Sequence, residues 1–336
     1  MNRRFILCGM VLVCLFAFPS TCPAPLVYTP GEGWSYESVG GAKWKRNRAK
    51  DQFDVAQEFF DNKEYGTASK AARRTVKVWP LSDYAPKAQY LMARCYEARK
   101  QDEKAFKAYQ TLIEKYPKLG NYDEVLHRQY EIAIRFLNGQ WRKLWGVIPF
   151  FSSMDLAARM FADVVKNGPY SAIAPEAQMD IGAAREKQAS FFNKTQPFVE
   201  AIQAYETAAD RYHDRKDIQS TAIFRAGLAY YHQAGKAEYD QSLAGSAIST
   251  FQDFTELFPE DPRVQEANTL VANLKEDQAR GNYEIARWYE KKKKWDGAVI
   301  YYNEVLLTDP KSVYADQARN RIETIKIARG KTRPKE

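Results

Sequence analysis

The sequence predicts an all-α solenoid of about six helical hairpins followed by a C-terminal capping helix. Apolar residues recur at three- and four-residue spacing from about Arg46 to about Arg329, which is typical of amphipathic helices. No segment shows the sustained alternation of a β-strand. Apolar residues make up 45% of the 336 residues, so the chain has enough of them to form a core and is not disordered as a whole.

An internal repeat accompanies this helical periodicity. Six alanines mark it: Ala68, Ala105, Ala157, Ala201, Ala247 and Ala298. Twelve residues after them stand Pro80, Pro117, Pro169, His213, Pro259 and Pro310, and four residues after them stand Ala72, Tyr109, Phe161, Tyr205, Phe251 and Tyr302. Proline is only 15 of the 336 residues, so five prolines at six such positions indicate a true repeat in which proline ends the second helix of each hairpin.

The first helix of each hairpin has a related pattern, a small residue three positions before an aromatic one. The pairs are Ala56 and Phe59, Ala93 and Tyr96, Ala133 and Phe136, Gly227 and Tyr230, and Ala286 and Tyr289. In the fourth repeat, Ala183 takes the small position and Glu186 stands where an aromatic residue is expected. Two antiparallel helices with this spacing are typical of tetratricopeptide repeats, in which small residues let helices approach and aromatic rings fill the space between hairpins.

These positions define the repeat core that we expect to be buried. They are Ala56, Phe59, Ala68, Ala93, Tyr96, Ala105, Tyr109, Phe161, Tyr205, Phe251, Ala286, Tyr289, Ala298 and Tyr302. A last amphipathic helix from about Ser312 to Arg329, using Val313, Ala315, Ala318, Ile322, Ile325 and Ile327, is expected to cover the final hairpin.

The chain is therefore expected to contain six segments. They are a signal peptide (1–22), an extended linker or arm (23–45), N-terminal repeats (46–117), stretched middle repeats with an apolar insertion (118–215), C-terminal repeats with the capping helix (216–329) and a polar tail (330–336).

The first 22 residues have the composition of an export signal. Arg3 and Arg4 precede an uncharged run from Phe5 to Phe18, which is short for a helix that spans a membrane. Cys22 follows directly, and a bacterial lipoprotein signal ends at a cysteine that receives a lipid. Proline replaces the usual aliphatic residue at position 19, so lipidation of Cys22 and simple cleavage nearby are both open alternatives.

We expect neither catalysis nor a cofactor or metal. Three histidines stand in different repeats and none lies at ligand spacing from another, and Cys95 is the single cysteine after position 22. The net charge of +8 comes with interleaved acidic residues and without a nucleic-acid recognition motif, so no nucleic-acid partner is expected.

Two regions are candidate partner-binding surfaces. The insertion between positions 138 and 153 is too apolar for a solvated loop, so it either folds back onto the solenoid or exposes a patch that includes Trp141 and Trp145. The second region is the turn of the sixth hairpin, which carries Lys291, Lys292, Lys293, Lys294 and Trp295. A solvated turn is the plain interpretation of this charge run, and contact with lipid headgroups or an acidic partner is the alternative.

The arrangement resembles the BamD family of outer-membrane assembly lipoproteins. The resemblance is based on the export signal near a cysteine, the short arm, the Tyr116-Pro117 and Phe258-Pro259 junctions, and the segment from Asn282 to Tyr289 followed by Trp295 to Ala298 and Asp309-Pro310. It is best over about residues 218–328 and weaker over 46–117, and residues 121–213 look like additional material.

The resemblance implies a non-catalytic adaptor at the periplasmic face of the outer membrane. The implied partners are the barrel-insertion machinery, contacted near Lys291 to Trp295 and the last helix, and unfolded outer-membrane proteins, contacted by the N-terminal repeats. A lipid on Cys22 would anchor the chain, and without it the chain would be soluble in the periplasm. A scaffold for another envelope or secretion complex is the alternative function.

Overall fold

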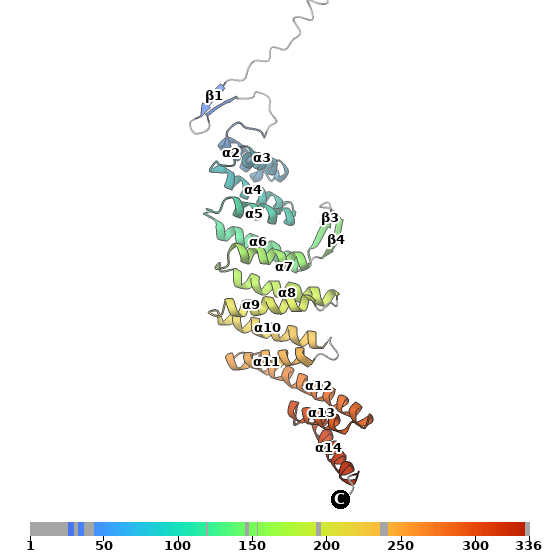
Figure 1. The fold of residues 1–336 in the computed structure, drawn as a ribbon. Helices are drawn as coiled ribbons and strands as arrows, with labels where there is room; N and C mark the ends of the chain where they lie inside the picture. Colours follow the sequence, from blue (N-terminus) through green and yellow to red (C-terminus); the bar gives the residue numbers. More distant parts are fainter. Residues whose placement is uncertain are drawn as a thin grey trace, which may run out of the picture. The chain divides into compact units, whose positions relative to one another are not determined.

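Thirteen α-helices of the described residues form six hairpins and a final single helix (Figure 1). The computed structural model describes residues 26–29, 33–36, 44–118, 120–144, 148–152, 154–192, 196–235 and 241–332. The chain divides into two units, residues 1–120 and 121–336. The prediction of six hairpins with a C-terminal helix is confirmed.

The N-terminal unit contains the first two hairpins. Their helices are α2 (Ala49–Asp61), α3 (Tyr65–Val78), α4 (Tyr84–Ala98) and α5 (Asp102–Lys115). Gln52 is fully buried in the first hairpin, where its side-chain amide donates to the Trp44 carbonyl (2.9 Å) and its Oε1 accepts the Arg46 N–H (2.8 Å). These bonds hold residues 44–46 against the hairpin.

The C-terminal unit contains four hairpins and the last helix. The helices are α6 (Tyr122–Leu137), α7 (Met154–Asn167), α8 (Ala174–Phe192), α9 (Gln196–Arg211), α10 (Lys216–Ala234), α11 (Gln241–Leu257), α12 (Val264–Lys291), α13 (Trp295–Thr308) and α14 (Val313–Thr332). Neighbouring helices pack in chain order within this unit. Five helices (α3, α5, α7, α11 and α13) end two residues before a proline of the repeat, as the missing N–H of proline requires.

Two short antiparallel β-hairpins interrupt the helical pattern, and the sequence did not predict them. β1 (Leu26–Thr29) pairs with β2 (Gly33–Tyr36) inside the segment expected to be an extended arm. β3 (Trp141–Leu144) pairs with β4 (Ile148–Ser152) inside the apolar insertion, with a bulge between Arg142 and Lys143. Strands of four or five residues are too short to show a clear alternation, which is why they were missed.

The small position of the fourth repeat is Gly182 and not Ala183. Gly182 is buried, and a Cβ built on it would lie only 2.4 Å from Tyr205 Cε1, whereas Ala183 is partly exposed. Gly227 in α10 has the same relation to Phe251, with a built Cβ at 2.6 Å from Cε1. The aromatic ring of the second helix therefore fills the space that the missing Cβ leaves in the first.

Buried glutamine side chains join the two helices of several hairpins. Gln52, Gln89 and Gln178 each donate a side-chain N–H to a backbone carbonyl of the second helix, at Ala71 (3.3 Å), Ala108 (2.8 Å) and Ala204 (3.0 Å). Each glutamine stands four residues before the small position, and each carbonyl belongs to the residue before the position of the repeat aromatic. A carbonyl has two lone pairs, so it can accept this bond together with its helical one.

Candidate partner-binding surfaces

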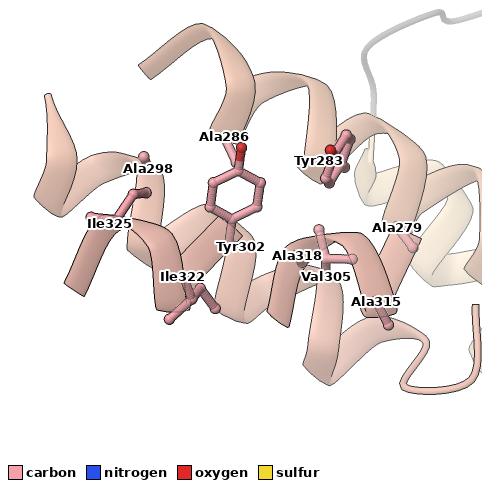
Figure 2. Close-up of a cluster of buried hydrophobic side chains, with 10 residues drawn as sticks. All are labelled: Ala279, Tyr283, Ala286, Ala298, Tyr302, Val305, Ala315, Ala318, Ile322 and Ile325. Atoms are coloured by element: carbon pink, nitrogen blue, oxygen red, sulfur yellow. The ribbon is translucent and has the colours of Figure 1, made fainter. Parts of the chain in front are cut away.

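The sixth hairpin and the last helix share one hydrophobic core. Figure 2 shows its ten buried side chains, which come from α12, α13 and α14: Ala279, Tyr283, Ala286, Ala298, Tyr302, Val305, Ala315, Ala318, Ile322 and Ile325. Tyr302 is fully buried, and its ring lies 5.5 Å from that of Tyr283. The last helix thus covers the hairpin, although Val313 and Ile327, expected on its buried face, are 67% and 54% exposed.

A three-residue polar contact ties these three helices together. The Tyr302 hydroxyl donates to Glu290 Oε2 (2.6 Å), and the Arg321 guanidinium donates to both oxygens of Glu290 (3.2 and 3.0 Å). Burial and the bond to Glu290 raise the pKa of Tyr302 above its usual value. A buried phenol next to a carboxylate stays protonated and donates, so the contact fixes α12, α13 and α14 in one arrangement.

The same contact occurs wherever the repeat aromatic is a tyrosine. Tyr109 donates to Glu97 and Tyr205 to Glu186, each at 2.6 Å. Each glutamate stands four residues after the small position of its repeat. This role was not predicted, because in the sequence Glu186 stands where an aromatic residue of the repeat is expected. In the other three repeats the tyrosine position holds alanine or phenylalanine, and the glutamate position holds Phe60, Leu137 or Tyr231. Glutamate therefore occurs only in repeats that also have the tyrosine, and this pairing was the signal available in the sequence.

The predicted core positions lie as follows. Ala56, Ala68, Ala93, Ala105, Tyr109, Phe161, Phe251, Ala286, Ala298 and Tyr302 are fully buried, Tyr205 and Tyr96 nearly so, and Phe59 and Tyr289 are partly buried against their clusters.

The lysine turn between α12 and α13 is exposed. Lys291, Lys292, Lys293 and Lys294 all lie at the surface, and none forms an ion pair within the described part of the chain. Lys293 has a positive φ of 59°, its N–H donates to the Glu290 carbonyl (2.8 Å), and the Lys294 N–H donates to the Tyr289 carbonyl (3.0 Å). This is a helix-ending motif with lysine in the place that glycine usually takes.

Two tryptophans flank this turn differently. Trp288 is 52% exposed, and Lys292 Nζ lies 6.0 Å from its ring centroid. Trp295, predicted as a partner-binding residue, is partly buried against the shared core. Trp288, which the sequence did not mark as a binding residue, is therefore the accessible aromatic residue beside the four lysines.

One face of α13 also carries exposed apolar side chains. Ile300 is 60% exposed and Leu307, two turns later, is 77% exposed. Residues seven apart lie on the same side of a helix, so these two side chains form an apolar strip along α13, with Ile300 nearer the lysine turn and Leu307 at the far end of the helix.

The apolar insertion forms the β3–β4 hairpin, which makes no more than isolated contacts with helices (Figure 1). Trp141 begins β3 and pairs with Ser152, while Trp145 lies outside the described residues. Binding of a partner by this hairpin stays a prediction.

The expected signal peptide and Cys22 also lie outside the described residues. No helix in the part that the structure describes is long and apolar enough to cross a membrane. Among the described residues no group of three or more His, Cys, Asp or Glu side chains is arranged to hold a metal ion. Cys95 is fully buried, and this burial raises the pKa of its thiol to about 12, which leaves it in the unreactive protonated form.

Comparison with known proteins supports both the expected tetratricopeptide repeats and the expected resemblance to the BamD family. Residues 87–118 match the tetratricopeptide repeat family, and residues 193–336 match the YfiO family, described as an outer membrane lipoprotein. The outer membrane protein assembly factor BamD of Haemophilus influenzae is 24% identical over 153 residues. The chain is a tetratricopeptide-repeat protein whose C-terminal part, residues 193–336, is similar to the BamD family. The match covers 43% of this chain and 55% of the relative, so the BamD-like chain spans about half of that protein's length.

Solved tetratricopeptide structures resemble it more loosely. The C-terminal part of a repeat protein from Cytophaga hutchinsonii is 15% identical over 82% of this chain and 88% of its own, with a TM-score of 0.32. MamA from Desulfovibrio magneticus is 13% identical over 64% of this chain and 97% of its own, with a TM-score of 0.31. The family match over residues 193–336 covers α9 to α14, and these helices include the lysine turn and the exposed apolar residues of α13.

Proposed function

We propose that the protein is a non-catalytic adaptor in the assembly of outer-membrane β-barrel proteins. The match of residues 193–336 to an outer membrane lipoprotein family is the observation that supports it most, together with the relative whose name is outer membrane protein assembly factor. Hairpins stacked around a continuous core provide large rigid surfaces, which suits a protein that holds others.

We propose that the C-terminal surface binds the barrel-insertion machinery. The surface combines Trp288, the four lysines from Lys291 to Lys294, and the strip of Ile300 and Leu307. An exposed aromatic ring beside basic side chains, with exposed apolar side chains on the next helix, has the composition of a protein-binding site whose partner is acidic at its rim.

We further propose that the protein acts at the periplasmic face of the outer membrane, anchored through a lipid on Cys22. Mass spectrometry of the mature N-terminus tests the anchor. A lipid-sized mass on Cys22 is the expected result, and a free amine at another residue would leave the protein soluble in the periplasm.

Depletion in the source bacterium tests the function. We expect β-barrel proteins in the outer membrane to fall when the protein is depleted and to return when it is supplied again. Unchanged barrel levels on depletion would contradict the proposal.

Rescue with variants tests the surface separately. Lys291→Gln, Lys292→Gln and Lys294→Gln together should restore barrel levels poorly. Lys77→Gln, Lys107→Gln and Lys118→Gln remove the same charge from exposed positions of the N-terminal unit and should restore them fully. Equal rescue by both variants would reject the lysine turn as a docking site while leaving the function itself intact.

A further inference from the structure

A basic pocket lies in the N-terminal unit, between α3 and the turn that joins α4 to α5. Its volume is about 340 Å³. Four cationic side chains line it, Lys70 and Arg73 from α3, Arg99 from the end of α4 and Lys104 from α5. No carboxylate lines it. The pocket therefore gathers positive charge from three helices at one place.

The charges of this pocket have no ion-pair partner among the described residues. None of the four cations forms an ion pair among the described residues, whereas other arginines pair closely, such as Arg185 with Asp155 at 2.9 Å. Arg73 donates to the Tyr96 hydroxyl oxygen, which leaves the hydroxyl hydrogen of Tyr96 available to another acceptor. The pocket consequently presents several donors and cations to an anionic occupant.

Gln101 also lines the pocket, but its side-chain Oε1 is buried and exposes no surface to an occupant. The four cations therefore decide which occupant fits. A peptide with acidic side chains matches them, because its carboxylates are spaced along a chain and can reach cations that come from three helices. A single phosphate group places its charge at one point.

The lining is open beside one of its residues. Gly66 lies at the start of α3, and a Cβ built on it meets nothing within 4 Å. The volume lies near the lower end of ligand pockets, which is enough for one or two acidic side chains and too small for a folded domain.

We propose that this pocket binds an acidic segment of a partner protein. The proposal builds on the scaffolding role proposed above, but it concerns a surface in the other unit of the chain. The segment is extended and brings at least two carboxylates, one for the Lys70 and Arg73 side and one for the Arg99 and Lys104 side.

Fluorescence anisotropy with the full chain tests this. The probe is a labelled hexapeptide of alternating Asp and Ser, titrated at low salt. Lys70→Gln, Arg99→Gln and Lys104→Gln together should weaken binding at least tenfold. The control carries Lys77→Gln, Lys107→Gln and Lys118→Gln, so it has the same net charge as the pocket variant. It should bind the peptide within about twofold of the wild type. Circular dichroism should show equal helix content for the wild type and both variants.

Three results would overturn the proposal. They are absence of binding by the wild type, equal weakening in both triple variants, and displacement of the peptide by an equal concentration of inorganic phosphate or by vesicles of anionic phospholipid. None of these results bears on barrel assembly, so this proposal and the proposed function can fail independently.

Discussion

The pairing of a buried tyrosine with a glutamate makes a quantitative prediction in the second repeat. Tyr109 is fully buried, and its hydroxyl donates to Glu97, whose side chain is 14% exposed and also lies 3.7 Å from Arg94 Nε. Tyr109→Phe should cost about 1 kcal/mol, because Glu97 keeps Arg94. Glu97→Leu should cost about 2 kcal/mol, because the buried hydroxyl then has no acceptor there.

The double variant should be close to the wild type. Tyr109→Phe with Glu97→Leu reproduces the combination that the third repeat already has, Phe161 with Leu137. Replacing both partners by apolar groups is nearly neutral, so we expect a net cost below about 1 kcal/mol and a coupling of about 2 kcal/mol. Tyr109→Ala, which also empties the site, should cost about 3 kcal/mol or more.

Chemical denaturation followed by circular dichroism measures the free energy of unfolding of the wild type and of each of these four variants. The reasoning would be refuted if the cost of the double variant equalled the sum of the costs of the two single variants. A near-neutral Tyr109→Ala would show that the ring is not a core element.

Three further predictions concern the C-terminal unit. Gly227→Ala should cost about 2 kcal/mol, because its Cβ would meet the Phe251 ring at 2.6 Å. Gly245→Ala in the next helix, where a Cβ meets nothing within 4 Å, should stabilise the fold by about 0.5 to 1 kcal/mol. Thermal denaturation that ranks the two variants otherwise would contradict the packing of Phe251 on Gly227. Lys293→Gly should stabilise the fold by about 0.5 kcal/mol, because φ at this residue is positive. Lys292→Gly, at a φ of −83°, should destabilise it. Equal effects of the two changes in urea denaturation would count against this geometry of the turn. Hydrogen bonds from Arg263 lower the pKa of Asp261 to about 2, so the ionised carboxylate stabilises the fold above about pH 4, and this stability is lost as the pH falls through 2. Asp261→Asn should therefore cost about 1 to 2 kcal/mol at pH 7 and little below pH 2. A cost that does not depend on pH would contradict this prediction.

The sequence predicted the hairpins because their packing positions are chemically distinctive. Small residues, aromatic rings and helix-ending prolines recur at fixed spacing since each hairpin must stack on the next in the same way. The step from Ala298 to Pro310 located the end of α13 two residues before the proline, and the apolar period after it located α14 to within about three residues.

The polar core could not be recognised in the same way. Gln89 and Glu97 look like exposed helix residues in a sequence, and only the structure reveals that their side chains bond across the hairpin. The error at Ala183 had the same origin, because the glutamate four residues after Gly182 was not seen as the partner of Tyr205. The partner-binding surfaces depend on exposure, which periodicity predicted poorly at Trp295 and Val313.

Affinity purification of the tagged full chain from detergent-solubilised membranes tests the central claim most directly. We expect the barrel-insertion protein to copurify in roughly equal amounts and to be lost from the variant with Lys291→Gln, Lys292→Gln and Lys294→Gln. Recovery of the intact chain without any barrel-insertion protein would contradict the account.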